Sequence, residues 1–151
     1  MKKLRLLPLL LGIPMLVMAE NISVNSPDGN LKVTLSDNDG KLSYTVTYKE
    51  HSIIESSPLG LVANVGDYTK DAKLAEHKVN SIDEQYTLNR SKKANVHYVA
   101  NQLVATYNYP GRRTMQVVFN VSNNDIAFQY RLFPIRETAC AVVNNEITGF
   151  D

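Results

Sequence analysis

"SPDGNLKVTLSDNDGKLSYTV", residues Ser26–Val46, is the stretch that decides the fold class. It places two Asp-Gly pairs among residues that alternate strongly between apolar and polar. The apolar positions fall on one face of each of two extended segments: Leu31, Val33 and Leu35, then Leu42, Tyr44, Val46 and Tyr48. A period of two predicts half-buried strands, and the polar "SDNDG" between them supplies a tight turn. The stretch therefore predicts a β-hairpin.

The same period of two continues along most of the chain. Further strands are predicted at residues 53–55, 56–65, 81–88, 96–100, 103–109, 115–121 and 126–132. About nine strands, with turn signals at roughly 8 to 15 residue spacing, favour an all-β fold, an antiparallel β-sandwich. The expected interior side chains are Val33, Leu35, Val46, Val117, Phe119 and Phe128.

Two segments depart from this pattern. Residues 66–80, "GDYTKDAKLAEHKVN", are polar without a sustained period, which predicts a long surface loop with room for one helical turn at 72–77. Near the C-terminus, Glu146–Phe150 predicts a new strand with no turn after it. We expect that strand to leave an unpaired edge and an exposed apolar surface, as in a short variant or a cut coding region.

The first residues are typical of a targeting signal. Lys2, Lys3 and Arg5 precede an apolar run at 6–17 that ends in small residues. This predicts a secretory signal peptide over 1–19 and a domain over 20–151. A retained membrane anchor is the weaker alternative, because a span needs about 20 apolar residues and two prolines interrupt this run. We therefore expect an exported chain, periplasmic or extracellular, with no membrane span after cleavage.

Charge and cysteine content narrow the possible partners. The whole chain has a net charge of +1, and losing the three basic residues of the signal brings it to about −2. A near-neutral domain argues against nucleic acid, which selects a basic stripe. Cys140 is the single cysteine, so it can form no internal disulfide, and we expect it to be a small buried or half-buried residue.

Residues that could carry chemistry are dispersed along the chain. The turn aspartates are Asp28, Asp37 and Asp39, and the histidines are His51, His77 and His97. The aspartates are expected to bond their own turns, because "DNDG" lacks the downstream Glu of a calcium-binding loop. The histidines lie in different elements and predict no shared site. No Ser-His-Asp pattern, phosphate-binding glycine loop or CxxC pair occurs, so no catalytic and no metal residue is assigned.

The remaining charged pairs are expected to be solvated: Asp83 and Glu84 at the opening of a strand, Arg112 and Arg113 at a turn, and Arg136 and Glu137 after a strand. The Arg136 and Glu137 pair could instead meet a partner surface. The chain has eight tyrosines but no tryptophan. Because independent sugar-binding modules rely on aromatic platforms, the missing tryptophan counts modestly against that function.

Three stretches together carry a resemblance: "SPDGNLKVTLS", "GKLSYTVTYKEHSIIESSPLGLVA" and "NDIAFQYRLFP". In this order they resemble the N-terminal β-sandwich of glycoside hydrolase family 97, exported bacterial α-glucosidases and α-galactosidases. The similarity runs from about Val24 to Asp151. "HYVANQLVATY" looks like a looser version of a further family strand, in which Gln102 stands where Glu is usual.

The resemblance implies a super-sandwich related to mutarotase-like folds, packed on a catalytic (β/α)8 barrel. It also implies that the barrel supplies the catalytic carboxylates and most ligands of a calcium ion. The sandwich would add one acidic ligand from a region near or beyond Asp151, so no calcium is expected for this chain alone.

The expectation is thus a non-catalytic domain of an exported enzyme that hydrolyses α-linked sugars, inactive by itself. Its partners would be the barrel and a carbohydrate. Two alternatives remain open: an independent carbohydrate-binding module, and a structural or adhesin-like sandwich whose edges pair with partner chains.

Overall fold

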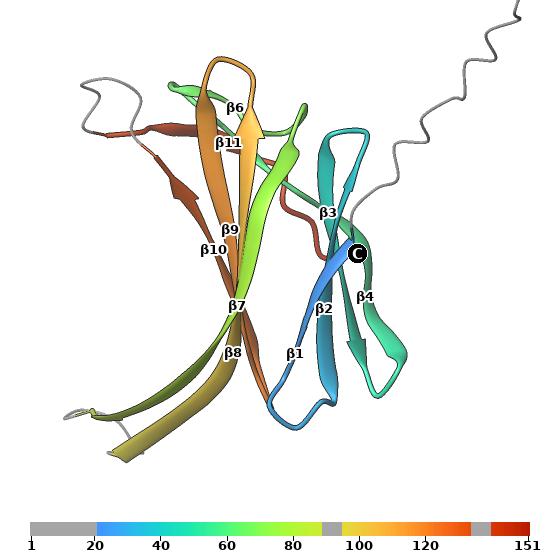
Figure 1. Cartoon of the computed structure of the whole chain (residues 1–151), viewed down its shortest axis with the longest axis vertical. Coiled ribbons are helices and arrows are strands. Elements are labelled where there is room, and N and C mark those ends of the chain that lie inside the picture. The colour runs from blue at the N-terminus through green and yellow to red at the C-terminus, as the bar shows by residue number, and fades with distance from the viewer. Residues whose placement is uncertain (1–20, 89–94, 134–139) are drawn as a thin grey trace, which may run out of the picture.

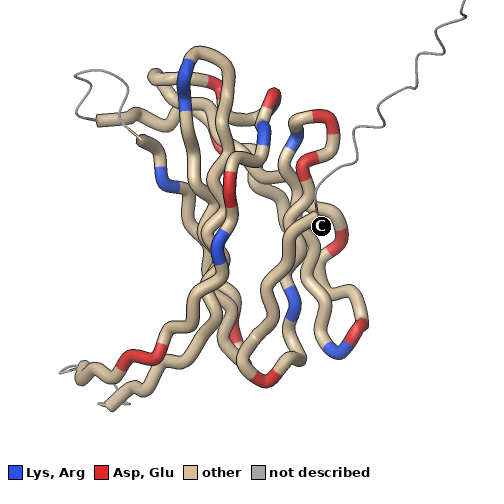
Figure 2. Tube along the Cα trace, in the orientation of Figure 1, with Lys and Arg blue, Asp and Glu red and all other residues tan. Residues whose placement is uncertain are grey.

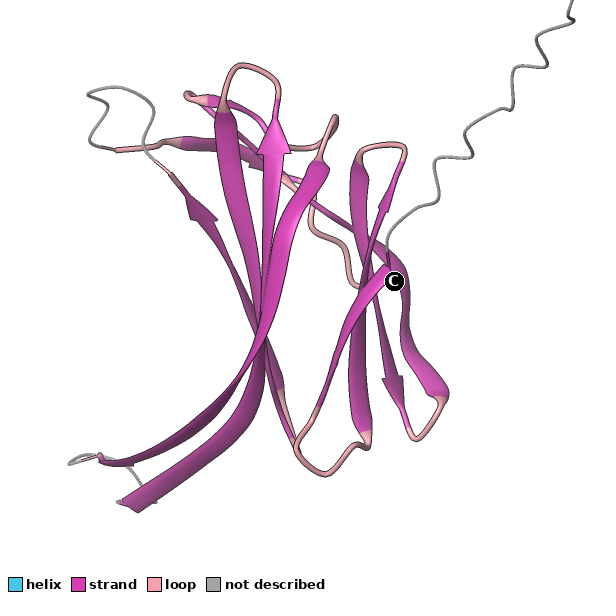
Figure 3. Ribbon diagram, in the orientation of Figure 1, coloured by secondary structure: helices cyan, strands magenta, loops and turns pink. Residues whose placement is uncertain are grey.

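The computed structural model describes residues 21–88, 95–133 and 140–151, and every regular element within these ranges is a strand. Figure 3 shows this all-strand composition. The strands are β1 (Asn21–Asn25), β2 (Leu31–Asn38), β3 (Lys41–Tyr48), β4 (His51–Leu59), β5 (Leu61–Ala63), β6 (Gly66–Asp67), β7 (Lys73–Thr87), β8 (Asn95–Tyr109), β9 (Arg113–Ser122), β10 (Ile126–Leu132) and β11 (Val143–Glu146).

The strands form two four-stranded sheets and one small sheet. The orders are β1-β2-β3-β4, β10-β9-β8-β7 and β11-β5-β6, and every pairing is antiparallel. The two large sheets lie face to face as two layers, with β1 and β2 against β8 and β9 (Figure 1). The predicted fold class, an all-β antiparallel sandwich, is confirmed.

The β2–β3 hairpin has the predicted register. Val33 pairs with Val46 and Leu35 with Tyr44, so the apolar side chains of both strands fall on the inner face. The turn between them uses a positive φ at Asp39 (51°) and at Gly40 (73°). A Cβ at Gly40 would lie 2.9 Å from the Asp71 Cα atom, so both the conformation and the space select glycine there.

The core lies between the two large sheets. Five of the six expected interior side chains are buried: Val33, Leu35, Val46, Val117 and Phe119. Phe128 lies on the expected face but is half-buried, because β10 is the edge strand of its sheet. The Phe128 ring stacks on Phe119 at 5.5 Å between centroids and contacts Tyr44 at 6.4 Å. Aromatic packing therefore extends the core to this edge.

The prediction of a surface loop over residues 66–80 is wrong, because this range contains strand β6 and the first half of β7. β7 is the other edge strand of its sheet, and nearly all of its side chains are exposed. Backbone pairing with β8 holds β7 in place without a buried face. Because neither face of such a strand is buried, its sequence shows no alternation of apolar and polar residues.

The two strands predicted at 96–100 and 103–109 are one continuous strand, β8. Its first five residues, 95–99, pair only with β7 residues 83–87, because the β9 pairing ends at Ala100. These ten residues form the β7–β8 arm, which extends past the sandwich at the lower left of Figure 1. The arm is a two-stranded ribbon with no second layer over it among the described residues.

The C-terminal segment, residues 142–151, is a second correction, because the strand predicted at Glu146–Phe150 lies instead at Val143–Glu146, as β11, and residues 147–151 are not in a strand. β11 pairs with β5, and the chain then runs along the edge of β4 instead of leaving it open. Ile147 N donates to Gly60 O at 3.0 Å, and Gly149 N donates to Pro58 O at 3.1 Å. Exposed apolar side chains do gather on this segment, as expected: Val142, Val143, Ile147 and Phe150. The expected unpaired edge, however, is paired on its β4 side.

We predict that truncating the aromatic core row destabilises the fold in proportion to burial. Phe119→Ala should cost about 3 to 5 kcal/mol of unfolding free energy, and Phe128→Ala less, because its ring is half-exposed. Urea denaturation followed by circular dichroism measures both. Phe150→Ala, at a ring 70% exposed, is the control and should cost far less than Phe119→Ala. Equal costs at the two positions would contradict this assignment of the core.

Candidate functional site

Five tyrosines lie in or against the hydrophobic core, and two of them bond the C-terminal segment. This tyrosine cluster comprises Tyr44 of β3, Tyr68 after β6, Tyr107 and Tyr109 of β8, and Tyr130 of β10. Their strands bring them together because each lies at an inward-facing position of its strand or turn. Because it carries hydroxyl groups into an apolar core, the cluster is the first candidate for a site.

Two members of the cluster carry hydroxyls without a hydrogen-bond partner among the described residues. Tyr68 and Tyr109 are buried, and their rings meet edge to face at 5.1 Å. Burial raises the pKa of the Tyr109 hydroxyl far above its usual value, with further contributions from Tyr107 and Tyr130. Both hydroxyls therefore stay protonated at neutral pH and cannot act as bases. They can hold a polar ligand or a water molecule.

Tyr130 links three parts of the chain through its hydroxyl. Gly60 N donates to Tyr130 Oη at 3.0 Å. Tyr130 Oη donates to Thr148 Oγ1 at 2.7 Å, because the Thr148 hydroxyl donates its own hydrogen to Glu146 Oε1 at 2.8 Å. Burial raises the pKa of Tyr130, which keeps the donating hydrogen in place. This chain of bonds fixes the C-terminal segment to β10.

The C-terminal segment is also bonded along β3 and β4. Tyr44 Oη donates to Gly149 O at 3.0 Å, and Asp151 N donates to Ser57 Oγ at 2.8 Å. Glu55 N donates to Asp151 O at 2.8 Å. A Cβ at Gly149 would lie 2.9 Å from Pro58 Cδ, so only glycine allows this close approach. The segment is therefore fixed to β3 and β4, and it bonds two members of the tyrosine cluster, Tyr44 and Tyr130.

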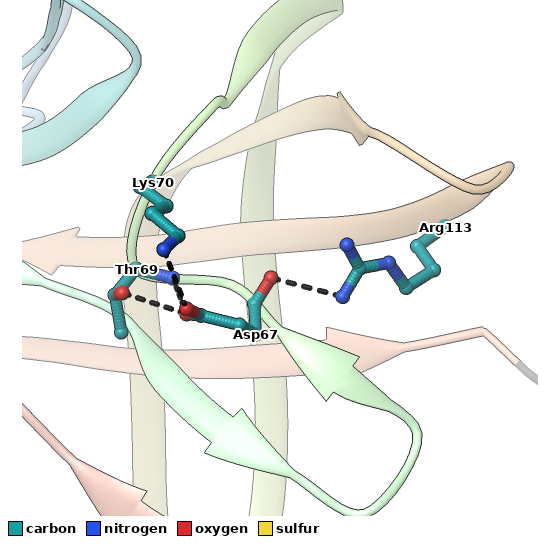
Figure 4. Close-up of polar contacts among 4 residues, drawn as sticks. All are labelled: Asp67, Thr69, Lys70 and Arg113. Atoms are coloured by element: carbon teal, nitrogen blue, oxygen red, sulfur yellow. Dashed lines mark hydrogen bonds and ion pairs between the residues drawn. The ribbon is translucent and has the colours of Figure 1, made fainter.

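A second polar group surrounds Asp67, at the turn that follows β6 (Figure 4). Asp67 Oδ1 accepts from Thr69 N at 2.9 Å and from Thr69 Oγ1 at 2.6 Å, while Lys70 Nζ lies 3.7 Å from Oδ2. The Thr69 hydroxyl bond, followed by its backbone bond, holds the pKa of Asp67 below its usual value. These bonds stabilise a turn and occupy one oxygen of the carboxylate, Oδ1.

Arg113 was predicted to be a solvated residue at a turn, and this is wrong. Arg113 Nη1 donates to Asp67 O at 3.1 Å, and Nε donates to Pro110 O at 2.7 Å. Its guanidinium carbon lies 5.6 Å from the centroid of the Tyr68 ring. Arg113 therefore joins the β8–β9 turn to the Asp67 turn and covers Tyr68. Arg112 is exposed, as expected.

The histidines lie on separate strands, as predicted, whereas the aspartates differ: Asp28 and Asp39 lie in turns, but Asp37 lies within β2, which corrects its predicted place in a turn. Asp28 Oδ1 accepts from Ser26 Oγ at 2.5 Å and from Asn30 N at 3.0 Å, and these bonds lower the Asp28 pKa. The three histidines are exposed on separate strands, and among the described residues no group of three or more His, Cys, Asp or Glu could hold a metal ion. His97 Nε2 lies 2.7 Å from Asp83 Oδ1 on the β7–β8 arm.

Two further expectations concern single positions. Cys140 is exposed, which corrects the expectation of a buried or half-buried thiol, because it precedes β11 outside both large sheets. Arg136 and Glu137 lie outside the described residues. Asp83 and Glu84 are exposed as expected, although they lie within β7 and not at the opening of a strand.

Two carboxyl groups, those of Glu146 and Asp67, lie within these two polar groups. Glycoside hydrolysis uses two carboxyl groups that flank one bond, at about 5 to 10 Å from each other. Glu146 accepts a hydrogen bond from Thr148 Oγ1, and Asp67 accepts one from Thr69 Oγ1. The described residues thus define a β-sandwich whose core includes tyrosine hydroxyls, of which those of Tyr44 and Tyr130 are bonded and those of Tyr68 and Tyr109 have no partner among the described residues.

The comparison with known proteins covers nearly all of the domain. Residues 24–151 match the family described as Glycosyl-hydrolase 97 N-terminal. The chain belongs to this family. It is 29% identical over 134 residues to a retaining alpha-galactosidase of Bacteroides thetaiotaomicron, matching 86% of this chain and 19% of that protein.

Comparison with solved structures gives the same fold. A beta-arabinopyranosidase crystal structure superposes with a TM-score of 0.81 and 39% identity, over 85% of this chain and 21% of the other. A Glycoside Hydrolase Family 97 enzyme from Pseudoalteromonas sp. strain K8, in complexes with panose and acarbose, superposes with a TM-score of 0.76. At 23% identity over 84% of this chain, that second likeness concerns the fold alone. The chain spans about a fifth of each relative's length.

Surface charge and hydropathy add two findings. Lys and Arg lie among Asp and Glu on several strands and turns, without forming a continuous stripe along the described part of the chain (Figure 2). No helix in that part is long and apolar enough to span a membrane.

We predict that Tyr130→Phe loosens the C-terminal segment. The change leaves Gly60 N and Thr148 Oγ1 without their shared partner and should cost about 1 to 3 kcal/mol of unfolding free energy. Hydrogen exchange should accelerate at Ile147 and Gly149 before the core unfolds. Tyr86→Phe, at an exposed ring on the arm, is the control. Unchanged exchange in the Tyr130 variant would show that the segment is held without this hydroxyl.

We predict a stability difference at Asp67 that disappears in acid. The Asp67 pKa is lower in the folded chain than its ordinary value of 3.8, so its stabilisation is present above pH 3.8 and is lost as pH falls through the folded-state pKa. Wild type should therefore unfold at a higher temperature than Asp67→Asn at pH 7, and the gap should close in more acidic buffer. Asp39→Asn controls for the loss of one carboxylate. A gap that persists unchanged in strong acid contradicts this linkage.

Proposed function

We propose that this chain is the non-catalytic N-terminal β-sandwich of an exported glycoside hydrolase that acts on α-linked sugars. Its role is to support the active site of a (β/α)8 barrel, the partner domain on which it packs. The observation that carries the proposal is family membership over residues 24–151, together with a span of about a fifth of each relative. The relatives' printed names, a retaining alpha-galactosidase and a beta-arabinopyranosidase, support a glycoside substrate.

Export is part of this proposal. The basic start and apolar run of residues 1–19 support a cleaved signal peptide and a periplasmic or extracellular site of action. A sugar-processing domain without internal disulfides is compatible with either compartment. Cys140, exposed and single, has no second cysteine in the chain to pair with.

Calcium belongs to the complete enzyme in this proposal. A calcium ion takes six to eight oxygen ligands, several of them carboxylates. The described residues of this chain include no cluster that could supply such a set alone. Any carboxylate that this chain contributed would act together with ligands from another domain.

A contribution to carbohydrate binding is favoured by one surface, the outer face of the β7–β8 arm. Glu84 pairs with Tyr98 and Tyr86 pairs with Val96, so these four side chains share one face. The Tyr86 ring is 45% exposed. Burial raises the pKa of Tyr98, and Asp125, Tyr86 and Glu84 add to the rise. Tyrosine faces beside carboxylates can stack on a sugar ring and accept its hydroxyl hydrogens.

The third reading, a structural or adhesin-like sandwich, is less favoured as the main role. Membership of a hydrolase family supplies a specific partner domain, whereas nothing in the fold alone selects adhesion. An independent sugar-binding module remains the second candidate, and the arm carries it.

We predict that the chain alone shows no turnover of aryl α-glucosides or α-galactosides, with or without added calcium. A chimera tests the supporting role: residues 24–151 replace the matched segment of the Bacteroides thetaiotaomicron retaining alpha-galactosidase. We expect the chimera to hydrolyse its α-galactoside, and the same enzyme without any replacement segment to be inactive or insoluble. Turnover by the chain alone that is lost in Glu146→Gln would overturn the non-catalytic assignment.

We predict that the arm, if it binds sugar, does so through Tyr86. Amide chemical shifts of residues 83–87 and 95–99 should move on titration with panose, and Tyr86→Ala should weaken the effect about tenfold or more. Tyr48→Ala is the matched control, because Tyr48 is 39% exposed on a different sheet. Shifts that are equal in both variants, or confined to the opposite sheet, would remove the arm from consideration.

A further inference from the structure

The chain has two Asp-Gly pairs, and both lie in β-turns. Asp28 and Gly29 lie between β1 and β2, whereas Asp39 and Gly40 lie between β2 and β3. The glycine of each pair has a positive φ, 75° at Gly29 and 73° at Gly40. The same dipeptide thus occurs twice in one fold, but the hydrogen bonds around the two pairs differ.

An Asp-Gly pair can rearrange through a reaction between its two residues. The glycine nitrogen bonds to the aspartate Cγ atom, and the nitrogen's hydrogen leaves with a hydroxyl group of the carboxyl as water. The product is a five-membered succinimide ring, and the missing Cβ of glycine leaves the attacking nitrogen unhindered. Water then opens the ring. Opening at the side-chain carbonyl restores aspartate, whereas opening at the main-chain carbonyl gives isoaspartate, in which the main chain runs through Cβ and Cγ.

In the first pair, both reacting groups are held by hydrogen bonds. Gly29 N donates to Ser26 O at 2.9 Å, and this bond closes the turn. Asp28 Oδ1 accepts from Ser26 Oγ at 2.5 Å and from Asn30 N at 3.0 Å, while Oδ2 accepts from Asn30 Nδ2 at 2.7 Å. The Ser26 hydroxyl bond, followed by the Asn30 backbone bond, lowers the Asp28 pKa. A carboxylate that stays ionised is a poor target for the nitrogen, because it has no hydroxyl group to lose.

In the second pair, neither reacting group is held. Among the described residues, no group forms a hydrogen bond with Gly40 N, with the main-chain oxygen of Asp39 or with the Asp39 carboxyl group. The Asp39 side chain is exposed. Only the following peptide unit is fixed, because Ala72 N donates to Gly40 O at 2.9 Å. The peptide unit between Asp39 and Gly40 therefore rotates without losing a hydrogen bond to the described part of the chain.

The geometry of the β2–β3 turn favours the reaction. Asn38 pairs with Lys41 across a two-residue loop, and φ is positive at both central residues, 51° at Asp39 and 73° at Gly40. These values define a type I′ turn. Rotation of the central peptide unit converts it to type II′, in which ψ of the first central residue is about −120°. In an L-residue this ψ brings Cβ and the next nitrogen to the same side of the Cα–C bond, as the five-membered ring requires. Glycine adopts either sign of φ, so Gly40 permits both turns.

We propose that Asp39 is a site of spontaneous isoaspartate formation in the folded chain, and that the hydrogen bonds of the first turn protect Asp28 from it. Isoaspartate adds one atom to the main chain of the two-residue loop. The loop has little room there, because a Cβ at Gly40 would lie 2.9 Å from the Asp71 Cα atom. The longer loop therefore displaces Gly40 O from Ala72 N and releases the β2–β3 turn from the segment that precedes β7.

Prolonged incubation of the purified, folded chain in mildly acidic buffer, followed by peptide mapping, tests the proposal. Trypsin cleaves after Lys32 and Lys41, so Asp39 lies in the peptide of residues 33–41 and Asp28 in the peptide before it. An isoaspartyl peptide has the mass of its parent but elutes separately in liquid chromatography. We expect isoaspartate to accumulate in peptide 33–41 and not in the preceding peptide. The same incubation in denaturant removes the hydrogen bonds, and there both pairs should react at similar rates.

Asp39→Glu is the matched control variant. Glutamate keeps the charge, but its longer side chain would have to close a less favourable six-membered ring, so the isoaspartyl form of peptide 33–41 should disappear. The turn accepts glutamate, since Glu50 has a φ of 69° in the β3–β4 turn. Amide hydrogen exchange at Ala72 should be faster in the isoaspartyl form of the wild-type chain than in Asp39→Glu after equal incubation. Circular dichroism confirms that both chains are folded.

Isoaspartate that forms in peptide 33–41 of the folded chain, but not in the Asp28 peptide or in Asp39→Glu, supports the proposal. Equal accumulation at both pairs in the folded chain, or accumulation at Asp28 alone, overturns it. So does a folded chain without isoaspartate at Asp39 when the denatured chain forms it. A signal that persists in Asp39→Glu places the reaction at Asp37 and also counts against the proposal. Unchanged exchange at Ala72 in the isoaspartyl form overturns the release of the turn.

Discussion

The backbone groups at the sheet edges are the constraint on which the rest of this structure depends. In a two-layer sandwich, the backbone groups of each interior strand bond to the strands on both sides. Each edge strand, however, has a row of N–H and C=O groups that must bond to water, to another segment or to another chain. Here one edge is met by the C-terminal segment, which follows β4 from Gly60 to Glu55. The positions of Gly149, Thr148 and Ser57 all follow from that contact, because each either allows the close approach or bonds the segment.

The tyrosine cluster follows from the same closure. Tyr44 and Tyr130 would direct hydroxyls toward an open end of the core if the segment were elsewhere, and burying an unbonded hydroxyl is costly. With the segment in place, Gly149 O and Thr148 Oγ1 accept from them. Tyr68 and Tyr109 show the cost where such closure is incomplete, since their buried hydroxyls lack partners among the described residues. The bonded hydroxyls of Tyr44 and Tyr130 therefore attach the C-terminal segment to the sheets, which is consistent with a supporting domain.

The sequence predicts the fold where one face of a strand is buried and fails where neither face is. Val33, Leu35 and Val46 alternate with polar neighbours because the second sheet covers one side of their strands, and the alternation is visible without a structure. β7 has neither face buried along most of its length, so its first half, up to Asn80, carries no sustained period and was predicted to be a loop, whereas its second half was predicted to be a strand. Likewise, the contact between Tyr130 and Thr148 joins segments that are separated by 18 residues, and neither residue signals its partner locally.

The two edge strands of one sheet, β7 and β10, differ in composition and in exposure. β7 places lysine, glutamate and histidine along its edge and continues into an arm whose outer face carries Tyr86 and Tyr98. β10 keeps a regular, nearly uncharged edge and half-buried aromatic side chains. A charged edge resists a second strand but leaves side chains free to meet a soluble ligand, whereas an uncharged, regular edge accepts backbone pairing. The two edges of the same sheet thus differ in charge and in regularity, because β7 carries charged side chains and a register shift, whereas β10 pairs in an unbroken register and has one charged residue.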